Sequence, residues 1–266
     1  MRLNRFLAAA GLGSRRACEQ LIVSGAVSLN GSRVEKLATT VGDDDDVRVH
    51  GRQIRVARHI YILLNKPKGF VVTRSDERGR RTVYDLLPPE LGNLGHVGRL
   101  DKDSEGLLLM TNDGGLAQRL THPSHEIEKE YDVTLDKAFD TANIPRLLRG
   151  IYMEGGRARC ERVVPVASKR VKVVLRQGMK RQIRLMFYAL GYEVERLARI
   201  RIGPLRDEGL PSGRFRALTP REVEALAKPS EAPRTRRRPP RTKPAGSANR
   251  TTRSKKPAPG VIKSGY

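Results

Sequence analysis

The segment from Gly95 to Gly106 gathers the side chains of this chain that are best suited to chemistry. It reads Gly95-His96-Val97-Gly98-Arg99-Leu100-Asp101-Lys102-Asp103-Ser104-Glu105-Gly106 and runs directly into an apolar stretch, residues 107–110. A charged loop bordered by glycines can hold one carboxylate rigidly while a substrate backbone approaches closely. A carboxylate is ionised at neutral pH and can serve as nucleophile or general base. The pattern alone also fits a solvated turn, which is the commoner outcome.

Acidic residues raise the alternative of a metal-dependent nuclease. The candidate ligands are Asp101, Asp103, Asp113, the acidic run 43–46, and the histidines His122 and His125 on either side of Pro123. Their neighbours follow no recognisable metal-ligand spacing. The acidic run follows a glycine and precedes a strand pattern, as a solvated turn does. We therefore expect no metal site.

The elements that position the charged loop form an α+β domain, predicted to span residues 59–227. Many apolar, strand-like runs and few helical patterns favour a mixed or antiparallel sheet. The predicted strands cover residues 60–64, 106–111, 131–135, 163–166 and 171–175, and the predicted helices cover residues 115–120, 141–148 and 181–190.

A small α/β domain, two helices plus a hairpin, is predicted over residues 1–50. Apolar residues recur at helical spacing from Leu3 to Ala10, and Ser14 is a good N-cap for a second helix from Arg15 to Ile22. Asn30-Gly31 tolerates the positive φ angles of a tight hairpin turn. Residues 51–58, which are rich in arginine, are predicted to be a linker.

Composition favours a polyanionic partner. The 266 residues include 52 Lys and Arg against 29 Asp and Glu, a formal net charge of +23. Residues 228–266 are rich in Pro, Ala, Ser, Thr and cations, which predicts a disordered basic tail. The longest apolar runs are far shorter than the roughly 20 residues of a membrane-spanning helix. With only two cysteines as well, we expect a cytoplasmic protein without a membrane partner.

Four motifs together resemble the ribosomal RNA pseudouridine synthases. Gly98-Arg99-Leu100-Asp101, with Gly106-Leu107-Leu108 and Thr111-Asn112-Asp113-Gly114, resembles the active-site segment of that family. The flanking motifs are Asn65-Lys66-Pro67-Lys68-Gly69, Glu128-Lys129-Glu130-Tyr131 and Gln177-Gly178-Met179-Lys180-Arg181-Gln182-Ile183-Arg184. The N-terminal domain resembles the RNA-binding domain named after ribosomal protein S4, and the order is that of the RsuA type.

The resemblance implies roles for three catalytic residues. Asp101 attacks the target nucleoside or abstracts a sugar proton, so that the base leaves through its glycosidic nitrogen, turns and reattaches through carbon. Tyr131 lies against the uracil ring, and Arg184 lies near the aspartate, where a guanidinium holds a carboxylate ionised. No cofactor is implied. Arg181 stands where some relatives have a histidine, which puts a histidine-specific role in doubt.

Binding must offset the cost of extruding the target nucleotide from its helix, a few kcal/mol. Arg99 is a candidate to fill the space that the flipped base leaves. Contacts to phosphates supply affinity but little sequence information, so RNA shape should select the site. The predicted RNA-binding residues of the N-terminal domain are Arg5, Ser14, Arg15, Arg16 and Arg33.

The expected substrate is one uridine of ribosomal RNA, presented as a structured stem-loop or an assembly intermediate to a monomeric enzyme. Residues 178–184 and Gly209-Leu210-Pro211 resemble the enzymes of the large subunit, 23S, more closely. Modification of small-subunit 16S RNA stays open as an alternative. So does a non-enzymatic ribosome-binding or assembly factor with a degenerate synthase domain, although the presence of Asp101 argues against it.

Overall fold

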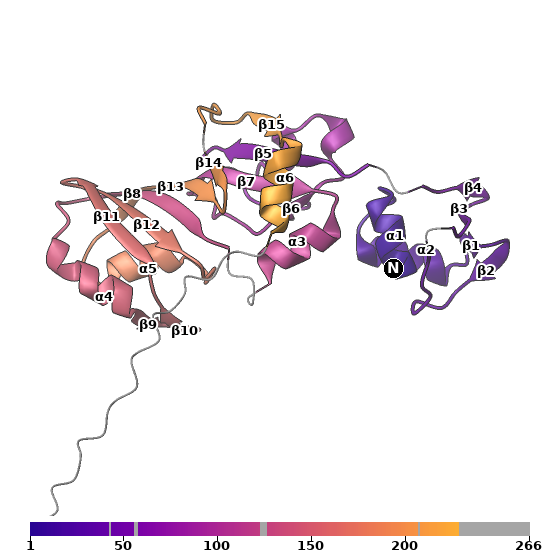
Figure 1. The fold of residues 1–266 in the computed structure, drawn as a ribbon, viewed down its shortest axis with the longest axis horizontal. Coiled ribbons are helices and arrows are strands. Elements are labelled where there is room, and N and C mark those ends of the chain that lie inside the picture. The colour runs from indigo at the N-terminus through magenta and orange to yellow at the C-terminus, as the bar shows by residue number, and fades with distance from the viewer. Residues whose placement is uncertain (43, 56–57, 123–126, 207, 229–266) are drawn as a thin grey trace, which may run out of the picture. The chain divides into compact units, whose positions relative to one another are not determined.

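Two helices and a four-stranded sheet form the N-terminal part of the computed structural model (Figure 1). The structure describes residues 1–42, 44–55, 58–122, 127–206 and 208–228. The helices are α1 (Leu3–Ala9) and α2 (Arg15–Val23), and the sheet has the order β2 (Ser32–Val34), β1 (Val27–Leu29), β3 (Val47–Val49) and β4 (Arg52–Gln53). Ser14 caps α2, because its Oγ accepts a hydrogen bond of 3.1 Å from the amide of Ala17. The predicted helix pair and hairpin are confirmed.

The turns of this small sheet follow the sequence closely. Asn30 and Gly31 have φ angles of 51° and 82°, as a two-residue hairpin turn requires. In the acidic run 43–46, Asp43 lies outside the described residues, and Asp45 accepts hydrogen bonds from Gly42 and Asn30, as in a turn. The predicted linker at 51–58 begins too early, because β4 pairs with β3 across a second tight turn.

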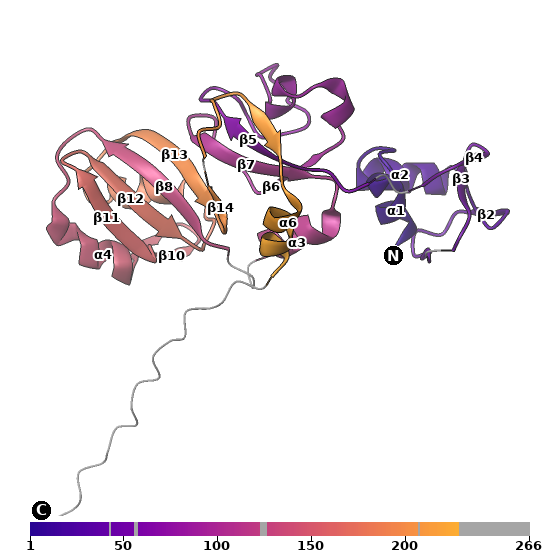
Figure 2. The same ribbon diagram turned by 45° about the horizontal axis from the view of Figure 1, so that its top comes forward.

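A nine-stranded mixed sheet organises the rest of the described chain (Figures 1 and 2). Its main path runs β11 (Arg162–Ala167), β12 (Arg170–Leu175), β8 (Lys129–Leu135), β13 (Val194–Ile202), β7 (Glu105–Thr111), β5 (Tyr61–Lys66) and β15 (Phe215–Ala217). Two short strands, β14 (Leu205–Arg206) and β6 (Gly95–Val97), pair with β13 and β7. The α+β class with a mixed sheet is therefore confirmed.

One parallel pairing joins the two halves of this sheet. β13 is antiparallel to β8 over most of its length but parallel to β7, with only Ala198 opposite Glu105 and Arg199 opposite Gly106. Gly106 has a φ of +99°, and a Cβ there would lie 2.3 Å from the carbonyl oxygen of Arg199. The strands thus approach so closely at this point that only glycine fits.

Helices cover both halves of the sheet. α4 (Ile144–Arg149) and α5 (Gln182–Tyr188) pack on β8 and β12 around Leu147, Met186 and Phe187. On the other half, α3 (Gly114–Thr121) and α6 (Pro220–Ala227) lie side by side in both views and pack on β5 and β7. The 3₁₀ helices are η1 (Val83–Leu86), η2 (Pro89–Leu91) and η3 (Thr141–Asn143), and β9 (Ile151–Met153) pairs with β10 (Gly156–Ala158).

The unbroken apolar run of β7 has a simple cause. Leu107 and Leu109 face the cluster under α3 and α6, whereas Leu108 and Met110 face a second cluster built from residues 70–100. A strand buried on both faces has no polar alternation. β7 can therefore anchor the charged loop that precedes it.

The predicted tail, apart from Lys228, lies outside the described residues.

Candidate active site

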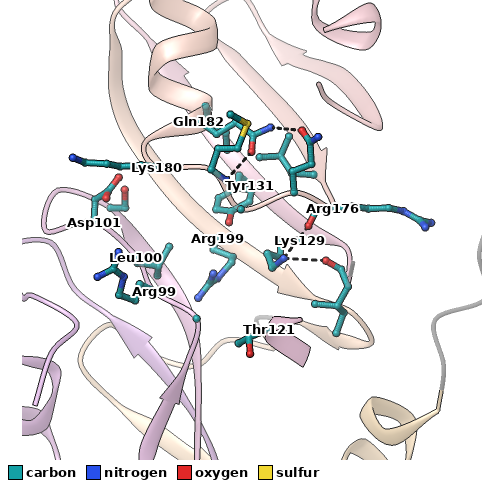
Figure 3. Close-up of a pocket in the computed structure, with 18 of the residues that line it drawn as sticks. Arg99, Leu100, Asp101, Thr121, Lys129, Tyr131, Arg176, Lys180, Gln182 and Arg199 are labelled. Atoms are coloured by element: carbon teal, nitrogen blue, oxygen red, sulfur yellow. Dashed lines mark hydrogen bonds between the residues drawn. The ribbon is translucent and has the colours of Figure 1, made fainter. Parts of the chain in front are cut away.

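A pocket of about 590 Å³ opens where the loop before β7 meets β8, β13 and the segment before α5 (Figure 3). Arg99 and Asp101 enter it from the loop, and Tyr131 and Gln182 enter from the opposite wall. Asp101 is half-buried and Arg99 is exposed. The fold therefore brings Asp101, Tyr131 and Arg99, which are distant in the sequence, to one cavity.

Backbone hydrogen bonds fix the loop that carries Asp101. The amide of Ser104 donates to the carbonyl of Asp101 at 3.1 Å, which closes a tight turn. The amide of Gly69 donates to the carbonyl of Lys102 at 2.8 Å and ties this turn to the segment after β5. Leu100, beside the aspartate, is buried in the core. The aspartate therefore sits on a rigid turn.

The side chain of Lys66 also holds this turn in place. Its side chain is fully buried, and its Nζ donates to the carbonyl oxygens of Ser104 at 2.6 Å, Pro67 at 3.0 Å and Lys102 at 3.3 Å. Burial lowers the pKa of Lys66 to about 8, against the opposing effect of Asp103 and Asp101. Although Lys66 belongs to a motif, no sequence pattern indicates this contact, because two of the three carbonyls come from residues 36 and 38 positions later.

Arg184 donates its hydrogen bonds to backbone carbonyls, one of them in the loop, and it also lies within electrostatic range of Asp101. Its Nη2 donates to the carbonyl of Asp103 at 3.0 Å, and its Nη1 donates to the carbonyl of Val194 at 2.6 Å. Within the described residues it forms no ion pair with Asp101, and it does not line the pocket. Burial lowers the pKa of Arg184, whereas the charges of Asp103 and Asp101 raise it. The guanidinium therefore interacts with the aspartate through its charge and without an ion pair in direct contact, because α5 directs the side chain to the backbone two residues beyond Asp101.

Tyr131 lies where the two halves of the sheet meet. Its ring packs against the core under α5 and also against the core of residues 70–100. Beside it, Arg201 pairs with Glu130 at 2.9 Å and with Glu128 at 3.1 Å. Although burial raises it, the pKa of Glu128 is lowered overall by hydrogen bonds from Arg201 and Arg176. These ion pairs hold the start of β8 and so the position of the tyrosine.

The wall opposite the loop is cross-linked by two glutamines. Gln182, which is buried, donates to the side-chain oxygen of Gln177 at 3.2 Å and to the carbonyl of Arg159 at 3.3 Å. Arg181 lines the pocket and adopts a left-handed conformation, with φ of 52°, immediately before α5. The residue at the position of the relatives' histidine therefore marks the sharp bend into this helix.

Asp113 has a structural position. Its Oδ1 accepts hydrogen bonds from the amides of Gly115 and Leu116 at the start of α3, and its Oδ2 accepts one from the hydroxyl of Tyr61. Burial, with this contact to Asp113, raises the pKa of Tyr61 to about 12. Across the part of the chain that the structure describes, no group of three possible metal ligands occurs.

The predicted RNA-binding residues of the N-terminal domain differ in how free they are. Arg15 and Arg16 are exposed and Arg5 is half-buried. Arg33 pairs with Glu35 at 3.0 Å and donates to the carbonyl of Ser24, and the hydroxyl oxygen of Ser14 serves as the helix cap. The two arginines at the start of α2 are thus the most available of the five.

None of the described helices has the length and apolar character needed to cross a membrane.

Known proteins with similar sequences share both parts of the chain. A family model described as RNA pseudouridylate synthase matches residues 60–189, and the S4 domain model matches residues 1–47. An uncharacterized RNA pseudouridine synthase of Mycobacterium leprae is 41% identical over 237 residues, 86% of this chain and 93% of that protein. A ribosomal large subunit pseudouridine synthase B of Bacillus subtilis is 36% identical over 231 residues, 85% of this chain and 95% of that protein.

A solved structure shows the same arrangement in three dimensions. A crystal structure of a pseudouridylate synthase matches with a TM-score of 0.63 at 31% sequence identity. The match covers 85% of this chain and 99% of that one.

Proposed function

Because the chain belongs to the RNA pseudouridylate synthase family, with an S4 domain ahead of the synthase domain, we propose that it isomerises one uridine of large-subunit ribosomal RNA to pseudouridine. The family supplies the reaction class and the RNA substrate. The choice of subunit is supported by the relative from Bacillus subtilis, whose name specifies the large subunit. We also expect the enzyme to act as a monomer.

The observation that carries the mechanism is the position of Asp101. It sits on a turn fixed by Ser104, Gly69 and Lys66, and it faces the same cavity as Tyr131. A base laid against the tyrosine ring would place its sugar toward the loop. Asp101 then attacks the sugar carbon or removes a sugar proton, and the base turns before it reattaches through carbon. Substrate and product are isomers, so the reaction consumes no co-reactant.

The remaining site residues have supporting roles in this proposal. Arg184 is a positioning residue, because it holds the backbone of the turn that carries Asp101. Arg99, exposed at the mouth of the pocket, is placed to occupy the gap left in the RNA by the extruded base. Arg15 and Arg16, with Arg5 and Arg33, would contact phosphates of the same RNA.

Asp101→Asn tests the assignment directly. The amide keeps the size of the side chain but removes the charge that the chemistry needs, so we expect loss of pseudouridine formation with RNA binding preserved. Purified protein is incubated with bare large-subunit or small-subunit ribosomal RNA, and pseudouridine is mapped by sequencing after chemical labelling. Activity equal to that of the wild type would rule out the mechanism.

The other readings give different results in the same assay. Product in the small-subunit RNA would reassign the substrate and leave the chemistry intact. Tight binding of ribosomal particles by the wild type, with every uridine unchanged, would indicate an assembly factor. Strand breaks that a chelator abolishes would indicate a nuclease.

A further inference from the structure

The floor of the pocket holds an arginine with an unused hydrogen-bond donor. Arg199, on β13, is 3% exposed and lines the cavity. Its Nε donates to the carbonyl of Leu107 at 2.7 Å, whereas its Nη2 has no partner among the described residues. Figure 3 shows the guanidinium pointing into the space between Arg99 and Lys129. An arginine stays charged in proteins, and a buried donor left unpaired is costly, so a ligand is expected there.

The register of the sheet places this donor beside the tyrosine. Arg199 and Tyr131 are direct partners in the antiparallel pairing of β13 with β8. Side chains at such positions lie on the same face of a sheet as close neighbours. The close approach of β13 to Gly106 and the bond to Leu107 fix the direction of the guanidinium. A ring stacked on Tyr131 would therefore present its edge to Nη2.

A second unpaired polar group lines the same pocket. The hydroxyl oxygen of Ser104 is buried, lines the pocket and has no hydrogen-bond partner among the described residues. A phosphate would bring its charged oxygens to the exposed mouth, where Arg99 and Lys180 lie. The floor suits the flat edge of a base, whose oxygens accept hydrogen bonds. The depth of Arg199 therefore favours the base over the phosphate.

We propose that Nη2 of Arg199 donates to a carbonyl oxygen of the extruded uracil and stabilises the base as it leaves the sugar, an inference that rests on the proposed function. When the bond between the sugar carbon and the base nitrogen breaks, its electron pair stays with the base. Asp101 either bonds to the sugar carbon or takes the proton from the neighbouring carbon. In both cases the detached base carries a negative charge shared by its carbonyl oxygens. A fixed cation at that oxygen acts where charge develops.

The test compares chemistry with binding in the full-length protein. Arg199→Met removes the charge and the donors while filling the same space. We expect the single-turnover rate at saturating protein to fall by about 100-fold, as when one oxyanion-hole donor is removed, and the Kd for RNA to change little. Arg196→Met is the matched control, because Arg196 lies on the same strand, half-exposed, and pairs with Glu105 outside the pocket. It should keep the wild-type rate.

The leaving group gives a readout that a purely structural role would not move. Fluorine at carbon 5 makes the base a better leaving group, so the deficit of Arg199→Met should shrink when 5-fluorouridine replaces the target uridine. Consumption of the nucleoside is followed by mass spectrometry. If Arg199→Met does not fold, Arg199→Lys, which keeps the charge but not the fork, is compared on both substrates. An equal deficit on both would overturn the proposal.

Two further results would also overturn it. A weaker Kd with an unchanged rate at saturation would mean that Arg199 only anchors the RNA. A deficit that disappears as the pH is raised would mean that Arg199 acts by keeping Asp101 ionised. If the wild type itself makes no pseudouridine in any ribosomal RNA, it is the proposed function that fails, so the two failures are distinguishable.

Discussion

The ammonium group of Lys66 is enclosed by three backbone carbonyl oxygens and by no carboxylate within ion-pair distance in the described chain. Carbonyl dipoles satisfy its donors but do not neutralise its charge. The pKa of Lys66 therefore falls to about 8, mainly because of burial. In the unfolded chain the same amine keeps a pKa near its usual value of 10.5. The buried charge of Lys66 therefore lowers the stability of the folded protein at neutral pH, although the same residue holds the turn that carries Asp101.

This difference predicts the pH dependence of stability. Between the two pKa values the unfolded chain binds more protons than the folded one, so the contribution of Lys66 to stability is smallest below pH 8 and rises with pH. We expect the free energy of unfolding of the wild type, relative to Lys66→Met, to increase by about 1–3 kcal/mol between roughly pH 7 and pH 10. Urea unfolding of both proteins across this range measures the difference. A constant difference would contradict the assignment.

The strands β7 and β13 can approach each other closely at Gly106 only because this residue has no Cβ. Gly106→Ala combines an unfavourable positive φ with a Cβ placed 2.3 Å from the backbone of β13. We expect a loss of roughly 3 kcal/mol or more in the free energy of unfolding, because both partners are backbone and cannot move aside independently. Gly114→Ala is the matched control, since Gly114 has open space around it and lies at the start of α3. Urea denaturation of the two variants checks the prediction, and equal stabilities would refute it.

The elements differ in how far their sequences reveal them. β5, β7, β8, β11 and β12 are predictable, because each is an apolar run bounded by turn residues. β13, at the centre of the sheet, was not predicted, because its buried Arg199 and Arg201 give it the composition of an exposed segment. Their charges are tolerated only because Glu130, Glu128 and the carbonyl of Leu107 come from other strands. No local pattern contains that information.

Other unpredicted elements were within reach of sequence reasoning. Thr219 and Glu222 form a capping box at the start of α6, and Pro220 is its first residue, a pattern that is visible in the sequence. By contrast, β6 and β14 are too short for any periodicity, and they exist because β7 and β13 offer them free edges.

The candidate site was predictable in its members more than in its contacts. The motif resemblance predicts that Asp101, Tyr131 and Arg184 belong to one site, and the fold places the first two in one pocket. The bond from Arg184 to the backbone of Asp103, rather than to the carboxylate of Asp101, depends on where α5 ends against the loop. The buried roles of Lys66 and Arg199 likewise arise from tertiary contacts, which a single sequence does not display.

At the scale of the whole molecule, the net charge of +23 is the feature most relevant to RNA binding. Many of the cations fall beyond Lys228 in the sequence. Deletion of residues 229–266 should weaken RNA binding and make its dependence on salt shallower, because fewer counterions are released, while the rate at saturation persists. A chain of equal length with neutral residues in place of the tail's Lys and Arg is the control for length. Binding titrations at several salt concentrations measure the slope, and an unaltered slope would exclude RNA contact by the tail.

The narrow parallel pairing of β7 with β13 has a consequence for substrate recognition. Asp101 stands on one side of this seam and Tyr131 on the other, and only two residue pairs span it. A small change in twist at the seam would be magnified at the pocket mouth, so the spacing between carboxylate and ring is a property of the junction more than of either half. A bound nucleotide would contact residues on both sides of this strand pairing and so fix the distance between the carboxylate and the ring. Correct recognition of the RNA would then also align the reacting groups.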